Sequence, residues 1–470
     1  MPCREKKRKL VVIALQTRLR RTDTDMTKGS VLGRLVAFAV PLLIGNIFQQ
    51  LYNTVDSVVV GNFVGKEALA AVGSVAPVVN MLIGFFNGFA TGAGVIISRY
   101  YGAQQKENVH IAVQTTIAMT ILMSVVLSIC GVLLTPALLR MMKTPEDVIA
   151  HSSEYLRIYF AGLSGLLLYN MGAGILRAVG DTRRPLYFLI FSAVTNTVLD
   201  LLFVTVFHMG VSGVAIATIL AQFASAVLVM VVLTRSTSDY RIVWRGMRLN
   251  KKMFGSICRL GFPAAVQLAV TSFSNIFVQS YINRFGADCM AGWTSHNKID
   301  SFVLLPIMTI SLAVTTFVGQ NLGAGDQARA RQGTRTALLL AEGVTAVLLV
   351  PLMLLSPQLI SLFNQEPEVL RYGTLFIRIV SPFYLVICIN QVLSGSLRGA
   401  GDSRNSVLII LASFVVFRQI YLAITYRVWG TVVAVALGYP AGWVLCSVLL
   451  LCYYRSGKWK KASIFKEKTQ

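Results

Sequence analysis

The stretch LRAVGDTRR, residues 176–184, returns later in the chain as LRGAGDSRN, residues 397–405. A second loop repeats in the same register, because YGAQQ at residues 101–105 matches LGAGD at residues 322–326. Both pairs are separated by about 221 residues. Agreement at one register over several loops predicts two copies of a single folding unit.

The repeated stretch has the chemistry of a helix end followed by a turn. Gly180 and Gly401 tolerate the left-handed backbone that often ends a helix. Asp181 and Asp402, which follow them, can cap the next helix. We therefore interpret both loops as structural turns rather than as functional motifs.

The composition is that of a membrane protein. Of the 470 residues, 55% are hydrophobic and 13% are charged, whereas soluble domains have roughly 25% charged residues. Apolar runs of about 20 residues recur, and each is long enough to cross a bilayer as a helix. The sequence predicts an all-α integral membrane protein with twelve transmembrane helices, at residues 35–61, 68–98, 109–136, 152–177, 185–207, 211–233, 255–284, 294–320, 334–356, 370–397, 405–427 and 430–454.

The distribution of positive charge predicts the topology. A formal charge of +23 would suggest nucleic-acid binding in a soluble protein. Most of the 43 Lys and Arg residues, however, lie in alternate loops, which by the positive-inside rule are cytoplasmic together with both termini. We therefore expect a multi-pass protein of the plasma or inner membrane that contacts the lipid bilayer and binds no nucleic acid. The opposite loops carry only Lys66, Arg140, Lys143, Arg284, Arg371 and Arg427.

Six expected helices fall in each half of the chain. Because six is even, the second copy enters the membrane from the same side as the first, so the repeat is parallel. This predicts two pseudo-symmetric six-helix bundles around a central cleft, in a monomer. MTKGSVLGRL from Met26 is typical of a natural start, so residues 1–25 are either a basic tail or a misassigned start. The expected segments are a basic cytoplasmic segment (1–33), an N-lobe (34–234), a cytoplasmic linker (235–254), a C-lobe (255–454) and a basic cytoplasmic tail (455–470).

The sequence contains no visible nucleotide or metal site. The phosphate-binding pattern G-x-x-x-x-G-K-[ST] is absent, and the 7 Cys and 4 His residues lack metal-ligand spacing. We expect no cofactor, no catalytic residue and no metal beyond a possible coupling sodium ion. Without ATP, transport must draw on an ion gradient, which requires a titratable or cation-binding group inside the membrane.

Two carboxylates of the first half lie at similar depth in their helices. Asp200 shares a helix face with Asn196. Asp56 lies about as many residues from the outer end of its helix as Asp200 does from the outer end of its own. Thr218 falls level with Asp200 across a tight hairpin. Such a layer can exchange a proton or coordinate sodium through its oxygens; the alternative is that Asp200 is a hydrogen-bonded packing residue. Two tyrosines can reach the same layer, Tyr52 and Tyr155.

Four stretches carry a family resemblance. They are PLLIGNIFQQLYNTVDSVVVGNFVG (41–65), ILRAVGDTRRP (175–185), SAVTNTVLD (192–200) and SHNKID (295–300). In content and order they resemble the multidrug and toxic compound extrusion (MATE) family, and most closely its bacterial and archaeal DNA-damage-inducible branch. The resemblance implies an ion-coupling network of Asp56, Asn196, Asp200, Thr218, Tyr52, Tyr155 and Asn170.

The second half departs from this network. Positions that correspond to Asp56 and Asp200 fall near Val278 and on Tyr421, so coupling by the C-lobe alone is disfavoured. Arg418 lies beside the counterpart of Asn196; we interpret it either as a fixed cation that replaces a C-lobe ion or as a buried Arg satisfied by Gln419 or carbonyls. Polar residues at helical spacing are expected to line the cleft with Arg418: Gln267, Asn275, Gln279, Asn297 and Asp300.

The sequence as a whole predicts a secondary exporter. It would exchange external H⁺ or Na⁺ for amphipathic, cationic organic compounds by alternating access. Two other functions stay open at this point. A flippase of a lipid-linked precursor would need a strongly basic, lipid-accessible cleft, and a membrane-embedded enzyme would need a nucleophile with a base or a metal.

Overall fold

The computed structural model describes residues 25–462 apart from positions 65, 143 and 145, and describes only the backbone at 53, 55–58, 62, 66–70, 77, 147 and 461–462. The side chain of Asp56 therefore lies outside the described residues. The predicted basic segment up to residue 24 and the tail from residue 463 lie outside them as well. Within the described ranges the chain is helical and contains no strand.

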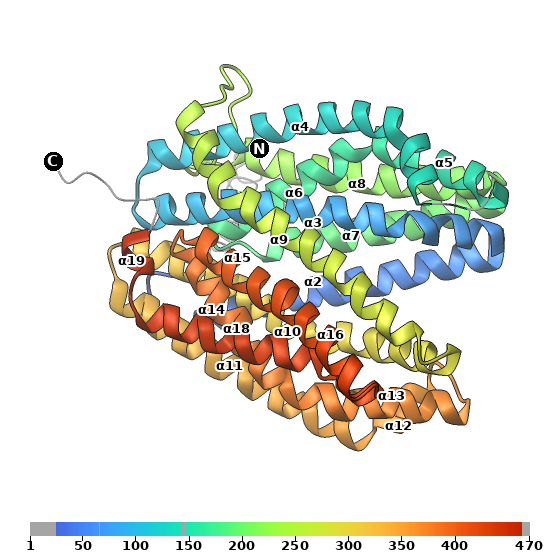
Figure 1. Ribbon diagram of the computed structural model, residues 1–470. Coiled ribbons are helices and arrows are strands. Elements are labelled where there is room, and N and C mark those ends of the chain that lie inside the picture. The colour runs from blue at the N-terminus through green and yellow to red at the C-terminus, as the bar shows by residue number, and fades with distance from the viewer. Residues whose placement is uncertain (1–24, 65, 143, 145, 463–470) are drawn as a thin grey trace, which may run out of the picture.

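The N-lobe is the upper bundle in Figure 1. Its π-helical turn η1 (Val60–Val64) extends the first helix, and η2 (Leu202–Val206) begins two residues after Asp200. π-turns inside α-helices are frequent at functional sites. The α-helices of this lobe are α2 (Val31–Val59), α3 (Lys66–Gly102), α4 (Lys106–Met141), α5 (Glu146–Ala161), α6 (Leu163–Ala178), α7 (Arg183–Leu201) and α8 (Gly210–Arg235).

The C-lobe is the lower bundle in Figure 1 and is more broken along its length. A 3₁₀ turn, η3 (Ser381–Phe383), and a π-helical turn, η4 (Ala412–Phe417), interrupt two of its crossings. Its α-helices are α9 (Lys251–Asn283), α10 (Ala287–Gly323), α11 (Gln327–Leu354), α12 (Ser356–Ser361), α13 (Pro367–Val380), α14 (Tyr384–Gly399), α15 (Ser403–Leu411), α16 (Arg418–Val428), α17 (Val432–Ala436), α18 (Gly438–Arg455) and α19 (Trp459–Ala462).

The prediction of twelve crossings is confirmed. Eleven segments of the described chain are long and apolar enough to span a membrane, and α5 with α6 forms a twelfth as a pair bent by 49°. The outer surface of the bundles is apolar, as lipid contact requires: Leu133 and Val347 are each 72% exposed. The chain is therefore a multi-pass membrane protein.

The repeated turn has the local structure that its residues predict. Gly180 and Gly401 adopt positive φ angles of 95° and 85°. The carboxylate of Asp181 accepts hydrogen bonds from the backbone N–H groups of Arg183 and Arg184, at 3.2 and 3.1 Å. Asp402 caps α15 in the same manner. The two copies therefore end one helix and start the next by the same chemistry.

Two long helices, α2 and α9, cross between the bundles (Figure 1). The crossing of α9 over α3 is backbone on backbone, because a Cβ atom added to Gly88 would lie 2.4 Å from the N atom of Ala265. A Cβ atom on Gly92 would lie 2.6 Å from the N atom of Gly261. Small residues permit this approach, as is common between membrane helices. This contact ties the C-lobe to the N-lobe.

The lobes also meet at one end of the molecule, which we call the termini end because α2 begins there and α19 lies there (Figure 1). Gln320, near the end of α10, joins both lobes: its Nε2 atom donates to the carbonyl of Ala178 at 2.8 Å. Its Oε1 atom accepts from the N–H of the buried Met26 at 3.1 Å. Arg99 of α3 donates to the carbonyl of Ala400 at 3.4 Å. The termini end is thus sealed.

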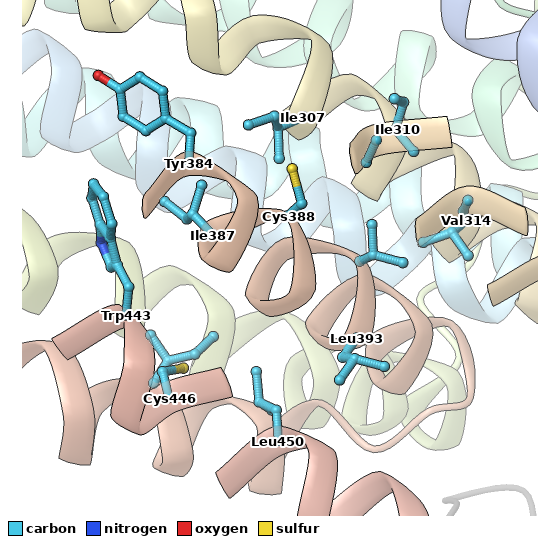
Figure 2. Packing of buried hydrophobic residues seen from close by; sticks show 14 of the residues in the cluster. Ile307, Ile310, Val314, Tyr384, Ile387, Cys388, Leu393, Trp443, Cys446 and Leu450 are labelled. Atoms are coloured by element: carbon cyan, nitrogen blue, oxygen red, sulfur yellow. The ribbon is translucent and has the colours of Figure 1, made fainter. Parts of the chain in front are cut away.

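The C-lobe is packed around one apolar core, part of which is shown in Figure 2, and the first turns of α2 join this core through Val31, Leu35 and Phe38. Cys388 of α14 points toward Ile307 of α10, and Trp443 of α18 lies on the other side of α14, with its ring centroid 6.1 Å from that of Tyr384. Interdigitated side chains of this kind hold a lobe rigid. A rigid lobe can move as a body, which alternating access requires.

Candidate functional site: a cavity between the lobes

A cavity of about 930 Å³ lies between the lobes. Helices α2, α3, α5, α6 and α8 form its N-lobe wall, and α10 forms the C-lobe wall. Its volume is at the upper end of the range of about 300–1,000 Å³ that small-molecule sites occupy. Six residues that the sequence analysis selected line it: Tyr52, Tyr155, Asn170, Thr218, Asn297 and Asp300.

A polar layer lies directly behind the N-lobe wall, between α7 and α8. The Nδ2 atom of Asn196 donates to the Oγ1 atom of Thr218 at 3.4 Å, and the Thr218 hydroxyl donates to the carbonyl of Val214 at 3.0 Å. Asp200, one turn after Asn196, is fully buried. The structure thus joins Asn196 to Thr218 and buries Asp200 one turn along the same helix, and of the three only Thr218 lies at the cavity surface.

The polar layer contains an oxygen atom that can bind a ligand. The Oδ1 atom of Asn196 is buried and accepts no hydrogen bond from any described residue. A buried acceptor without a donor is costly, and water or a cation can satisfy it. The oxygens gathered here are carboxylate, amide and hydroxyl, which suit a proton or a hard cation. The donor set therefore fits either of the two predicted coupling ions.

The remaining predicted N-lobe residues lie on the cavity wall rather than within this layer. Tyr155 stacks on Tyr159, with ring centroids 6.2 Å apart, and both rings line the cavity. Tyr52 of α2 lines it as well. Asn170 donates from Nδ2 to the carbonyl of Leu166 at 2.9 Å, within its own helix. These residues face whatever fills the cavity.

The predicted cleft residues of the C-lobe divide into two groups. Asn297 and Asp300 reach the cavity, whereas Gln267, Asn275, Gln279 and Arg418 are not among its lining residues. The reason is the path of α9, which packs on α3 through Gly261 and Ala265. Gln267, two positions after Ala265, lies on the opposite side of that helix. Farther along, the amide of Gln279 donates to Asn283 of the same helix at 2.8 Å.

Arg418 is held inside the C-lobe. Its Nη2 atom donates to the Oγ atom of Ser274 and the Oδ1 atom of Asn275, both at 2.8 Å. The guanidinium also stacks on the ring of Tyr439, 4.7 Å from the centroid. Gln419, which the sequence suggested as a partner, instead donates to Ser274. Arg418 thus joins α16 to α9 and α18.

We expect Arg418→Ala to lower the free energy of unfolding by about 2–3 kcal/mol, because it removes two charge-assisted hydrogen bonds and the packing of a buried side chain on Tyr439. Thermal unfolding of the purified protein measures this. Arg427→Ala is the matched control, since Arg427 lies exposed on the same helix. A variant as stable as the control would contradict the assignment. Normal transport with unchanged ion dependence would remove the fixed-cation hypothesis for Arg418.

Several cavity residues escaped the sequence analysis. The clearest is Arg177, which had been interpreted only as part of a helix-ending turn, yet it lines the cavity. A polar stripe on α3 was missed as well. Its spacing of 7, 4 and 7 residues is a helical signal that could have revealed it. The stripe consists of Asn80, Asn87, Thr91 and Ser98.

A chain that crosses the membrane twelve times, with a cavity between two lobes that are sealed at one end, is a membrane transporter by architecture. The MatE family model matches it twice, at residues 41–202 and 263–424, so the family's unit coincides with the internal repeat. The chain belongs to the MatE family. Because members of this family are transporters, the alternative of a membrane-embedded enzyme is ruled out.

Individual relatives agree with this assignment. The chain is 31% identical to the probable multidrug resistance protein YpnP of Bacillus subtilis, over 94% of this chain and 99% of that protein. It is 32% identical to YoeA of the same organism, also a probable multidrug resistance protein, over 93% and 96% of the two chains. A multidrug resistance MATE family transporter solved in an outward-facing conformation has the same fold, with a TM-score of 0.87 at 24% identity over 93% of this chain and 99% of that one.

Proposed function

We propose that this protein exports small amphipathic organic compounds across the cell membrane in exchange for external H⁺ or Na⁺. The observation that carries the proposal is Asp200, a carboxylate fully buried in a membrane span and one turn from an amide that contacts the cavity wall. Burial of such a group is expensive and is usual only where function requires it. The names of the related Bacillus proteins support multidrug compounds as cargo.

The proposed orientation follows from charge. The loops rich in Lys and Arg lie at the termini end, which by the positive-inside rule faces the cytoplasm. The sealed end is then cytoplasmic, and the cavity belongs to a state open toward the outside. One chain encloses the whole cavity, so we propose that the monomer is the transporting unit.

In this proposal, the ion acts through differential binding. A proton or sodium ion that enters from outside neutralises Asp200 and gains the free oxygen of Asn196, which draws α7 and α8 together behind Thr218. Because Thr218 forms part of the cavity wall, the change alters the surface that the compound contacts. The side chain of Asp56 is assigned to the same layer only by the family resemblance.

The flippase alternative is less well supported. It required a strongly basic cleft, and the described cavity wall carries one arginine, Arg177, and one carboxylate, Asp300. Its other polar groups are neutral amides and hydroxyls. Such a wall suits small polar or amphipathic molecules better than a polyanionic lipid head group.

Gradients imposed separately on membrane vesicles test the proposal. We expect inside-out vesicles that contain the protein to accumulate ethidium when either the pH gradient or the sodium gradient is imposed, and to stop when that gradient is collapsed. Vesicles without the protein are the control. Accumulation that ignores both gradients would overturn ion coupling, and no accumulation of any tested compound would overturn export.

A further inference from the structure

Arg177 is a cation on the cavity wall without an anionic partner. It lies near the end of α6 and is partly exposed to the cavity. Among the described residues, no carboxylate lies within ion-pair distance of it. Tyr169 lies beside it; its hydroxyl donates to the carbonyl of Pro185 at 3.1 Å, and none of the hydrogen bonds of the described residues joins Tyr169 to Arg177. The guanidinium donors therefore remain available to a ligand.

The repeat supplies an internal comparison, because Arg398 is the counterpart of Arg177 in the C-lobe. Arg398 is held by two hydroxyl groups: Nη1 donates to Ser394 at 2.8 Å and Nη2 donates to Ser311 at 3.2 Å. It is not among the residues that line the cavity. The two arginines thus occupy equivalent positions in the repeat, but Arg398 is hydrogen-bonded within its lobe and Arg177 faces the cavity.

The sequence explains the difference. At the offset of the repeat, Ser394 corresponds to Ala173 and Ser311 corresponds to Ala90. The packing confirms this register, because a Cβ atom on Gly174 would lie 3.5 Å from the Cβ atom of Ala90, and one on Gly395 would lie 2.8 Å from the Oγ atom of Ser311. Both hydroxyls that hold the C-lobe arginine are therefore replaced by methyl groups in the N-lobe.

An arginine without local partners in a membrane segment must be satisfied from the cavity. The planar guanidinium fork matches a carboxylate or phosphate with two parallel hydrogen bonds. The hydroxyl of Thr316 on α10 lines the same cavity and can add a further donor. Those of Ser98 and Thr315 line it as well but already donate to the carbonyls of Val95 and Gly395, at 3.0 Å each. On the C-lobe wall, Asp300 supplies the opposite charge.

We propose that Arg177 is the binding site for an acid group, a carboxylate in the first place, on the compounds that this transporter carries. The preferred compounds are then dipolar: their acid group pairs with Arg177, and Asp300 is available for a basic group. This deepens the proposed function, on which its relevance to transport rests. It departs from the purely cationic cargo that the sequence suggested.

A matched pair of dyes isolates the acid group. Rhodamine B carries a free carboxylate, and its ethyl ester has the same cationic ring system without it. Fluorescence anisotropy with the purified full-length protein in detergent gives a Kd for each. We expect the wild type to bind the free acid about tenfold more tightly than the ester, the order of one charge-assisted pair. We expect Arg177→Gln to abolish this preference and Arg177→Lys to retain part of it.

Arg398→Gln is the matched control, because it removes the equivalent charge from a site away from the cavity, and it should leave the ratio of the two Kd values unchanged. Equal affinities in the wild type, or a ratio that survives Arg177→Gln, would overturn the proposal. A ratio lost equally in Arg398→Gln would also overturn it, since the effect would then be structural. The assay uses no gradient, so a protein that discriminates the dyes but shows no gradient-driven accumulation would refute the exporter and leave the acid site standing.

Discussion

Asp200→Asn should reduce gradient-driven efflux to the level of cells that lack the protein, while the variant still accumulates in the membrane. The amide has almost the same shape as the carboxylate, so packing behind Thr218 is kept. It can neither take up a proton nor balance the charge of a sodium ion, so the layer can no longer change state with the gradient. Ethidium efflux from energised cells, normalised to the amount of protein in the membrane, measures the loss.

Two controls define what the loss means. Asp288→Asn removes a carboxylate that is exposed in the first turn of α10 and should transport as the wild type does. Asn196→Ala removes the free oxygen of the layer but keeps the carboxylate; it should weaken sodium-driven efflux more than proton-driven efflux, because coordination needs several oxygens. Efflux by Asp200→Asn at the rate of the Asp288 variant would show that coupling lies elsewhere.

The sequence predicted the elements of this fold well because a membrane restricts what an apolar run can do. A run of about 20 residues without charge has few structures available besides a spanning helix. The repeat of LRAVGDTRR as LRGAGDSRN, residues 176–184 and 397–405, then indicated the two-lobe arrangement. The hairpin register predicted Thr218 level with Asp200, and the hydrogen bond that the structure shows for Thr218 comes from Asn196, one turn earlier.

The cavity wall was harder to predict because it depends on where helices cross. A periodic pattern shows which residues share a helix face, but it does not show what the face meets. Gln267 and Arg418 looked like cleft residues by type, yet neither lies on the cavity wall. The crossing of α9 over α3 turns Gln267 away, and hydrogen bonds to Ser274 and Asn275 hold Arg418 inside the C-lobe. Arg177 looked like part of a turn. Its lack of partners comes from alanines at positions 90 and 173, where the other lobe has serines. The sequence of one lobe alone does not show that a hydroxyl group is missing there.

The seal at the termini end depends on two glycines related by the repeat. A Cβ atom on Gly102 would lie 1.9 Å from the carbonyl oxygen of Gln320, and one on Gly323 would lie 2.0 Å from the carbonyl oxygen of Arg99. Gly102 and Gly323 are separated by the offset of the repeat, as are Arg99 and Gln320. At each of the two contacts, the glycine of one helix therefore packs against a backbone carbonyl of the other helix. Because these carbonyls are backbone atoms, they cannot rotate away from a larger side chain. Small residues are what allow membrane helices to approach so closely.

We expect Gly102→Val to hold the lobes apart at this end and to reduce efflux at least tenfold, because a state in which α3 and α10 cannot meet cannot complete the transport cycle. Thr316, which lines the cavity, reports the opening. In a chain whose other cysteines are replaced, Thr316→Cys should react with a membrane-impermeant maleimide from the termini side faster when Gly102→Val is present than when it is absent, because the unsubstituted protein opens this end during only part of its cycle. Gly255→Val is the matched control, since a Cβ atom at Gly255 meets nothing within 4 Å. Normal efflux by Gly102→Val, with a cysteine that reacts no faster than in its absence, would show that this contact does not form the seal.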